Sequence, residues 1–140
     1  MKISFFRCFC FGIAAWFAST CVLFADEWPE YGHDPGRTAV QEDGLRFPLM
    51  KIWEYVPAQA PAPAWPFPGK ELHRLDFDYT FQPVVSHETV YFASSSDDTV
   101  RAVDVNTGRL KWSFTTAGPV RFAPVVRKNR VFFASDDGFV

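Results

Sequence analysis

The sequence predicts an all-β fold, a β-propeller of four-stranded antiparallel blades, and two observations carry this prediction. First, β-branched and aromatic residues alternate with polar ones at a period of two, which is typical of half-buried strands. Second, the segment Phe81–Ser94 returns 41 residues later as Phe122–Ser135, with 8 of its 14 positions identical. A repeat of about 40–45 residues made of short strands is the signature of a propeller blade. Helical repeats of similar length are excluded because they lack the period-two pattern.

The first repeat contains four predicted strands, at Phe81–Val85, Val90–Ser94, Thr99–Asp104 and Leu110–Thr115. Asn106-Thr107-Gly108 joins the last two strands, and Gly108 can adopt the positive φ that closes a short hairpin. On the outgoing strand, Leu110, Trp112 and Phe114 share one face. We therefore expect Trp112 to be a large, buried side chain.

This hairpin resembles the tryptophan-docking motif of quinoprotein-type β-propellers, the PQQ-like repeat family, whose pattern is Ala-x-Asp-x-x-Thr-Gly-x-x-x-Trp. Every fixed position of that pattern is filled, by Ala102, Asp104, Thr107, Gly108 and Trp112. The resemblance covers residues 76–140 strongly and 28–55 more loosely. It implies that the indole of Trp112 packs between the alanine of its own motif and the glycine turn of the neighbouring blade. Such a contact identifies a fold and does not by itself report a cofactor.

The resemblance implies two classes of function. The family includes alcohol dehydrogenases that use pyrroloquinoline quinone with calcium, and these typically carry a vicinal disulfide over the cofactor. It also includes non-enzymatic relatives, such as the BamB-like lipoprotein scaffold of the outer-membrane protein assembly machine. All three cysteines here, Cys8, Cys10 and Cys21, precede residue 26, so residues 26–140 contain neither that disulfide nor a thiolate metal site.

We expect a binding or assembly scaffold whose partner is a protein, with no catalytic, cofactor or metal residue in 26–140. The alternative is a quinone- and calcium-dependent oxidoreductase whose active site lies beyond residue 140. A third possibility is a propeller attached to a further domain. The repeat that begins at Phe122 reaches Val140 before its hairpin and tryptophan strand, and a propeller needs about 4–8 blades. The sequence therefore predicts an N-terminal fragment, with residues 76–140 as truncated propeller repeats.

The charge composition does not indicate a nucleic-acid partner, because 14 basic residues are balanced by 16 acidic ones. Residues 1–25 have the layout of a secretory signal peptide, with Lys2 and Arg7 ahead of an uncharged apolar run. Cleavage after Ala25 predicts export to the periplasm or the cell exterior. Two alternatives stay open: an uncleaved membrane anchor, because Leu23 is bulky for a cleavage site, and lipidation at Cys21.

Residues 26–75 form a predicted lead-in with two features. A closing strand at 49–56 contains Trp53 in the same context as Trp112, but no Ala-x-Asp-x-x-Thr-Gly hairpin precedes it. We expect this strand to complete the last blade of the propeller. A connector at 57–68 holds five prolines and is expected to be extended and semi-rigid. A peptide that docks on a partner is the alternative for the connector.

Three acidic pairings have both a functional and a structural interpretation. His33 beside Asp34 could bind a metal or act as an acid–base pair, but one histidine and one aspartate match no ligand spacing. Asp97-Asp98 and Asp136-Asp137 could bind calcium. Because both aspartate pairs fall at predicted hairpins and recur in both repeats, turn hydrogen bonding is the preferred interpretation. For His33 the preferred interpretation is a lead-in loop in which Trp28 and Tyr31 pack on the propeller.

Overall fold

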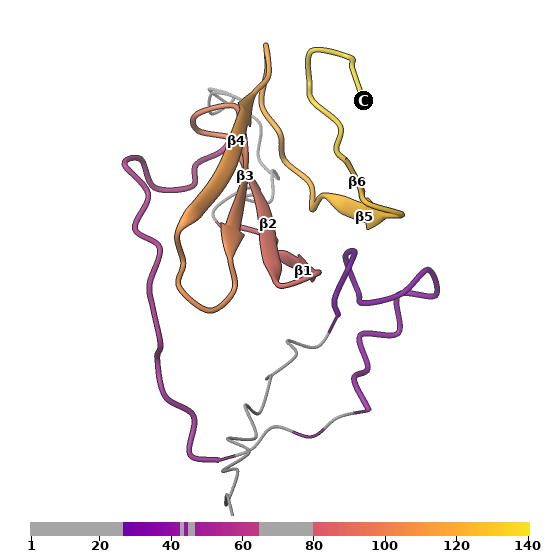
Figure 1. Ribbon diagram of the computed structural model, residues 1–140. Coiled ribbons are helices and arrows are strands. Elements are labelled where there is room, and N and C mark those ends of the chain that lie inside the picture. The colour runs from indigo at the N-terminus through magenta and orange to yellow at the C-terminus, as the bar shows by residue number, and fades with distance from the viewer. Residues whose placement is uncertain (1–26, 43, 45–46, 65–79) are drawn as a thin grey trace, which may run out of the picture.

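The structure is a computed structural model that describes residues 27–42, 44, 47–64 and 80–140 (Figure 1). The predicted signal peptide at 1–25, the end of the connector at 65–68 and residues 69–79 lie outside the described residues. Every regular element of the described part is a β-strand, so the all-β prediction is confirmed. The strands form one four-stranded and one two-stranded antiparallel sheet, and these sheets do not close into a ring.

The four-stranded sheet has the simplest antiparallel order, β1-β2-β3-β4. Its strands are β1 (Val84–Ser86), β2 (Thr89–Ser94), β3 (Thr99–Asp104) and β4 (Leu110–Thr115). β3 and β4 have the predicted bounds, and β2 begins one residue early. β1 starts at Val84 and not at Phe81, because Pro83 has no N–H group to donate to a ladder.

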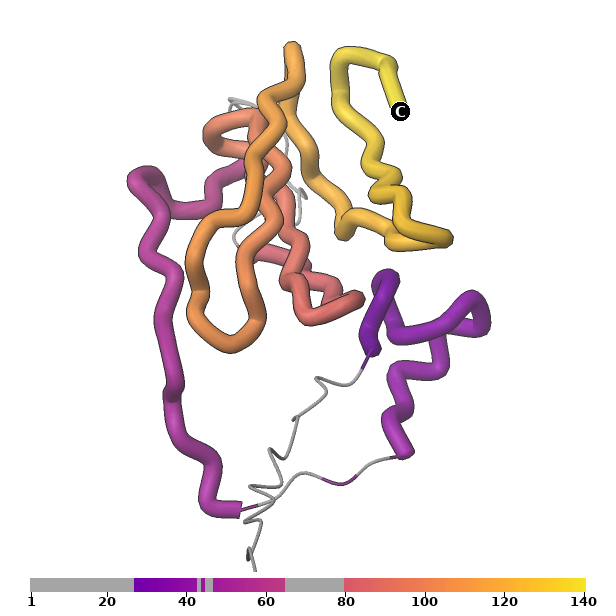
Figure 2. The backbone as a smooth tube through the Cα atoms, in the orientation of Figure 1, coloured from indigo at the N-terminus to yellow at the C-terminus, as the bar shows by residue number. Residues whose placement is uncertain are grey.

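The strand register assigns each side chain to one of two faces of this sheet. Ala102 lies opposite both Tyr91 and Trp112, so these three share a face, whereas Phe92 points to the other face. The stretch 51–64 covers the Phe92 face, where the ring of Tyr55 lies 4.8 Å from that of Phe92. The second repeat covers the other face. In Figure 2 the backbone descends from β4 to β5 on the side of the sheet opposite the stretch 51–64.

The second repeat contributes only β5 (Val125–Arg127) and β6 (Arg130–Phe132). Residues 131–135 match the strand predicted at Val90–Ser94 in the first repeat, but β6 ends at Phe132. Ser135 instead closes a turn, because its hydroxyl donates to the Gly118 carbonyl at 2.9 Å and its N–H donates to the Phe139 carbonyl at 3.1 Å. The core between the repeats is small and consists of Ala93, Val100 and Val120, with Phe133 packed against it.

The lead-in crosses the first strands of both repeats. Trp28 forms a β-bridge with Val85, in which each N–H donates to the other carbonyl, at 2.7 and 2.8 Å. The carbonyl of Pro29 then accepts the N–H of Val126 in β5 at 2.8 Å. The backbone of Trp28 therefore pairs with β1 and its side chain is half-buried, whereas Tyr31 is 62% exposed. The lead-in is held by backbone pairing more than by its aromatic side chains.

Two expected features do not appear in the described residues. Residues 49–56 form no strand in the described part of the chain, although Trp53 and Tyr55 are half-buried and their neighbours are exposed. The alternation of a strand is present, but its backbone has no ladder partner. Trp112 is 37% exposed, because β4 is an edge strand whose six residues are all exposed. In the described residues no further strand pairs with the open edge of β4.

Candidate functional site

The turn that joins β3 and β4 is held by one carboxylate. Oδ1 of Asp104 accepts the N–H of Asn106 at 3.1 Å, the N–H of Thr107 at 2.9 Å and the Thr107 hydroxyl at 2.9 Å. The N–H of Gly108 donates to the Asp104 carbonyl at 2.8 Å. These bonds favour the ionised carboxylate. The Thr107 hydroxyl, followed by the two backbone N–H groups, lowers the pKa of Asp104.

Gly108 has two reasons to be glycine. Its φ is +68°, in the left-handed region where side chains are strained. A Cβ at this position would also lie 2.8 Å from Cδ2 of Trp53, well inside normal contact distance. The indole of Trp53 therefore lies directly against the backbone of the turn. Only a residue without a side chain allows both the turn and this contact.

The same indole is fixed by a hydrogen bond. Nε1 of Trp53 donates to the carbonyl of Val105 at 2.7 Å, across 52 positions of the chain. Further along, the Ser95 hydroxyl donates to the Ala62 carbonyl at 2.6 Å. The stretch 51–64 is thus fixed to the four-stranded sheet through side chains, at the turn and again at the β2–β3 hairpin.

The five motif residues fall into two groups. Asp104, Thr107 and Gly108 build the turn and receive Trp53. Ala102 is fully buried and lies opposite Trp112, whose ring centroid is 5.9 Å from that of Tyr91. Because the stretch 51–64 lies on the Phe92 face and Trp112 lies on the Tyr91 face, the two tryptophans approach the sheet from opposite sides.

His33 and Asp34 lie in the lead-in turn. Their side chains are 3.8 Å apart, Nδ1 to Oδ2, and the His33 ring makes an edge contact with the Trp28 indole at 4.9 Å between centroids. The Asp34 carboxylate accepts the N–H of Thr38 at 3.2 Å and also its hydroxyl. The Thr38 hydroxyl lowers the pKa of Asp34, followed by the Thr38 N–H. These contacts agree with the lead-in-loop interpretation.

The two aspartate pairs also hold turns and ion pairs. Asp97 pairs with Arg101, and the Asp98 carbonyl accepts the Thr116 N–H at 2.8 Å. Partial burial alone would raise the pKa of Asp97, but the hydrogen bonds from Arg101 and Ser94 outweigh it and the pKa is lowered. Among the residues that the structure describes, no three His, Cys, Asp or Glu side chains are placed to hold a metal.

In the second repeat the corresponding aspartates have the same kind of role. Oδ1 of Asp137 accepts the Phe139 N–H and Oδ2 accepts the Ala117 N–H, both at 3.0 Å. Asp136 lies 3.6 Å from the guanidinium of Arg121. The N–H of Phe139, followed by that of Ala117, lowers the pKa of Asp137. These contacts favour the turn interpretation over calcium binding.

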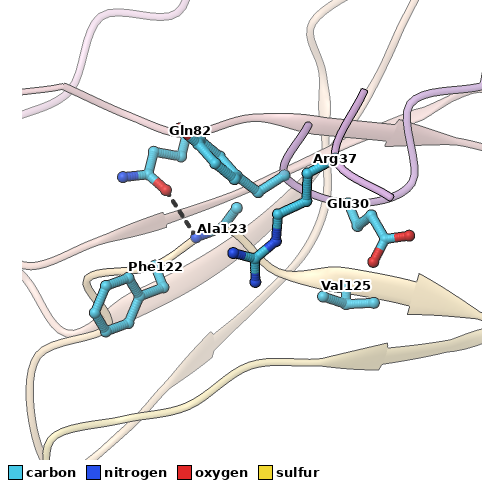
Figure 3. Close-up of a pocket in the computed structure, with 7 residues that line it drawn as sticks. Glu30, Arg37, Gln82, Phe122, Ala123 and Val125 are labelled. Carbon is cyan, nitrogen blue, oxygen red and sulfur yellow. Dashed lines mark hydrogen bonds between the residues drawn. The ribbon is translucent and has the colours of Figure 1, made fainter. Parts of the chain in front are cut away.

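A cleft of about 470 Å³ opens where the lead-in meets both repeats (Figure 3). Its floor is fixed by a hydrogen bond between equivalent repeat positions, in which Oε1 of Gln82 accepts the Ala123 N–H at 3.2 Å. The lining residues come from the lead-in, the approach to β1, and the second repeat: Glu30, Tyr31, Arg37, Gln82, Phe122, Ala123 and Val125. This cleft is the candidate binding site.

The sequence pattern does not reveal this cleft, because its three walls are far apart in the chain. The sequence does contain one feature that marks this place. The matched segments Phe81–Val85 and Phe122–Val126 differ only at their second residue, glutamine in one and alanine in the other. That single difference falls at the hydrogen bond that forms the floor.

Comparisons with models of known protein families and with curated proteins find no match for this chain. The residues that the structure describes include no helix of the length and apolarity needed to cross a membrane.

Proposed function

We propose that this chain carries the first repeats of an exported PQQ-like β-propeller that acts as a binding or assembly scaffold for other proteins. The observation that carries the proposal is the docking of Trp53 on the turn at 104–109. In the PQQ-like family, a tryptophan of one blade packs on the glycine turn of the next. Trp53 makes such a contact with Gly108 and adds a hydrogen bond to Val105.

The arrangement of the repeats supports the same proposal. The four-stranded sheet lies between the stretch that bears Trp53 and the second repeat, as a blade lies between its neighbours. In this interpretation Trp53 stands in for the preceding blade. Trp112 then occupies the equivalent position for the next blade, whose glycine turn would cover its exposed indole. The basic start and the apolar run at 8–25 support export to the periplasm or exterior, with membrane association if that segment is retained.

The structural roles of the aspartates support the proposed scaffold function. On a propeller, function resides in side chains at the strand ends and loops. In the described residues, Asp34, Asp104 and Asp137 accept hydrogen bonds that hold turns, and Asp97 pairs with Arg101. These carboxylates stabilise the fold. The open groups at the repeat junction are instead an arginine and two aromatic rings, which suit recognition.

Cross-linking tests the scaffold function. The whole protein, tagged and expressed in its native host, is cross-linked in intact cells, purified and analysed by mass spectrometry. We expect one defined protein partner at a fixed stoichiometry, with cross-links at the lead-in or at the strand-end loops. Recovery of uncross-linked protein alone, together with alcohol-dependent dye reduction in the presence of quinone and calcium, would establish the oxidoreductase instead.

A further inference from the structure

The most unusual residue of the cleft is Arg37. Its φ is +52°, a backbone conformation that is uncommon for a residue other than glycine, and such strain often accompanies function. The conformation is enforced locally, because the Arg37 N–H donates to the Asp34 carbonyl at 2.8 Å and the Ala39 N–H donates to the Gly32 carbonyl at 2.9 Å. A Cβ on Gly32 would lie 2.9 Å from Cα of Arg37. The turn therefore presents one side chain, that of Arg37, in a fixed direction.

The guanidinium of Arg37 has no ion pair or hydrogen bond within the part of the chain that the structure describes. It points into the cleft between Phe122 and Val125 (Figure 3). The nearest acidic residue of the lining, Glu30, is engaged by Arg127 and points away from it. Arg121, which also lies near, stacks over the Phe122 ring at 5.6 Å and faces Asp136. The cleft therefore carries one cation that is available to a ligand.

The surroundings of this cation are apolar. The rings of Tyr31 and Phe122 are each 62% exposed. A second cleft of about 420 Å³ shares Tyr31, Arg37, Gln82 and Ala123 with the first and extends toward Ala39, Phe81 and Pro83. Apolar lining thus continues on both sides of Arg37. The two clefts share Arg37 and together form a groove in which its guanidinium lies beside the Glu30 carboxylate that Arg127 engages, and we call this the Arg37 groove.

We propose that the Arg37 groove binds an extended segment of a partner protein through an acidic side chain flanked by apolar residues. One guanidinium beside an engaged carboxylate matches one monovalent carboxylate, bidentately, better than a phosphate dianion. Because the groove continues past the arginine on both sides, the carboxylate belongs to a residue within a chain. This proposal rests on the scaffold function and names the chemistry of its partner.

The probe is a fluorescein-labelled heptapeptide with capped ends, with a central glutamate between two leucines and glycine and serine elsewhere. Binding to the whole protein is followed by fluorescence anisotropy. We expect saturable binding, and at least about tenfold weaker binding when glutamine replaces the central glutamate, since a charge-assisted pair is lost. Equal binding of the two peptides, or no binding of either, would overturn the proposal. Equally tight binding of N-acetylglutamate would make the groove a small-molecule site and also overturn it.

Variants at two exposed arginines complete the test. Arg37→Gln should weaken binding at least about tenfold, whereas Arg109→Gln, in the turn at 104–109, should leave it unchanged. Arg37→Gly removes the guanidinium and relieves the left-handed backbone, so it should keep the melting temperature and lose binding. Arg37→Glu should prefer a peptide with central lysine. Identical binding by all variants would place the peptide elsewhere.

The two proposals can fail separately. If the cross-linked complex forms equally with wild type and Arg37→Gln while the peptides do not bind, the groove assignment is wrong and the scaffold function stands. If wild type forms no complex in cells, the scaffold function itself fails.

Discussion

Gln82 and Ala123 occupy the same position in successive repeats, and the side chain of the first accepts a hydrogen bond from the backbone of the second at 3.2 Å, across 41 residues. Two residues that are one repeat apart in the sequence are therefore in direct contact in the structure. Equivalent points of the repeats lie side by side at the approach to β1 and β5. A polar side chain at one point satisfies a backbone donor at the other.

The contact between Trp53 and Gly108 can be tested by adding one methyl group. Gly108→Ala should lower the free energy of unfolding of the whole protein by about 1–3 kcal/mol, because of the positive φ and the overlap with the indole. Denaturant midpoints measure this. Gly44→Ala is the matched control, since a Cβ there meets nothing within 4 Å. Equal midpoints for the two variants would show that the indole does not pack on the turn.

Trp112 is 37% exposed in the described residues, but we expect it to be buried in the whole protein. If the next blade covers it, Trp112→Ala should lower the free energy of unfolding by roughly 3–5 kcal/mol. The midpoint of Val40→Ala, a lead-in side chain that is 60% exposed, provides the comparison. A loss below 1 kcal/mol at Trp112 would mean that the indole stays at a surface and that the docking assignment for it is wrong.

The Asp104 turn predicts a dependence on pH. Because the folded-state pKa of Asp104 lies below its ordinary value of 3.8, the carboxylate contributes stability above that value, and the contribution is lost as pH falls through the folded pKa. Asp104→Asn should therefore be less stable than wild type at pH 7, and the difference should shrink below pH 3.8. Urea midpoints at pH 7, 5 and 3 measure it. If the difference in stability between wild type and Asp104→Asn is the same at every pH, the ionised carboxylate does not stabilise the turn.

The oxidoreductase alternative yields a direct prediction. We expect that the whole protein neither binds pyrroloquinoline quinone with calcium nor reduces a dye when alcohols or sugars are added. A titration of the purified protein with quinone and calcium, followed by absorbance, is the measurement. Stoichiometric binding together with alcohol-dependent dye reduction would replace the scaffold function with an enzyme.

Ring closure is testable through the backbone of residues 49–56. This stretch has no ladder partner within the described residues, and an unpaired strand edge invites aggregation. In the whole protein we expect a C-terminal Ala-x-Asp-x-x-Thr-Gly strand to pair with it and protect its amides from hydrogen exchange. The piece 26–140 alone should lack that protection and unfold without a sharp transition. A cooperative melt of that piece as a monomer would contradict the closure.

Local chemistry explains what the sequence could predict. Strands β3 and β4 and the turn between them were predicted at the residue level, because alternation, Asp104 and Gly108 are local signals that agree. The 49–56 strand was predicted from the same alternation, yet a ladder also needs a partner strand, which pattern alone cannot supply. The Arg37 groove was missed for a related reason: its walls come from three distant segments, and only the folded chain brings them together.

The lead-in has a consequence for the order of events during synthesis. Glu30 pairs with Arg127, 97 positions later, and the bond between Pro29 and Val126 is similarly distant. Trp28 can pair with Val85 once the first repeat has been made, but Pro29 and Glu30 cannot make these contacts until the second repeat follows. Closing so long a loop slows folding, and the exposed strand edges remain vulnerable to aggregation meanwhile. Under the proposed export from the N-terminus, the interval before this closure is the period in which a chaperone would matter most.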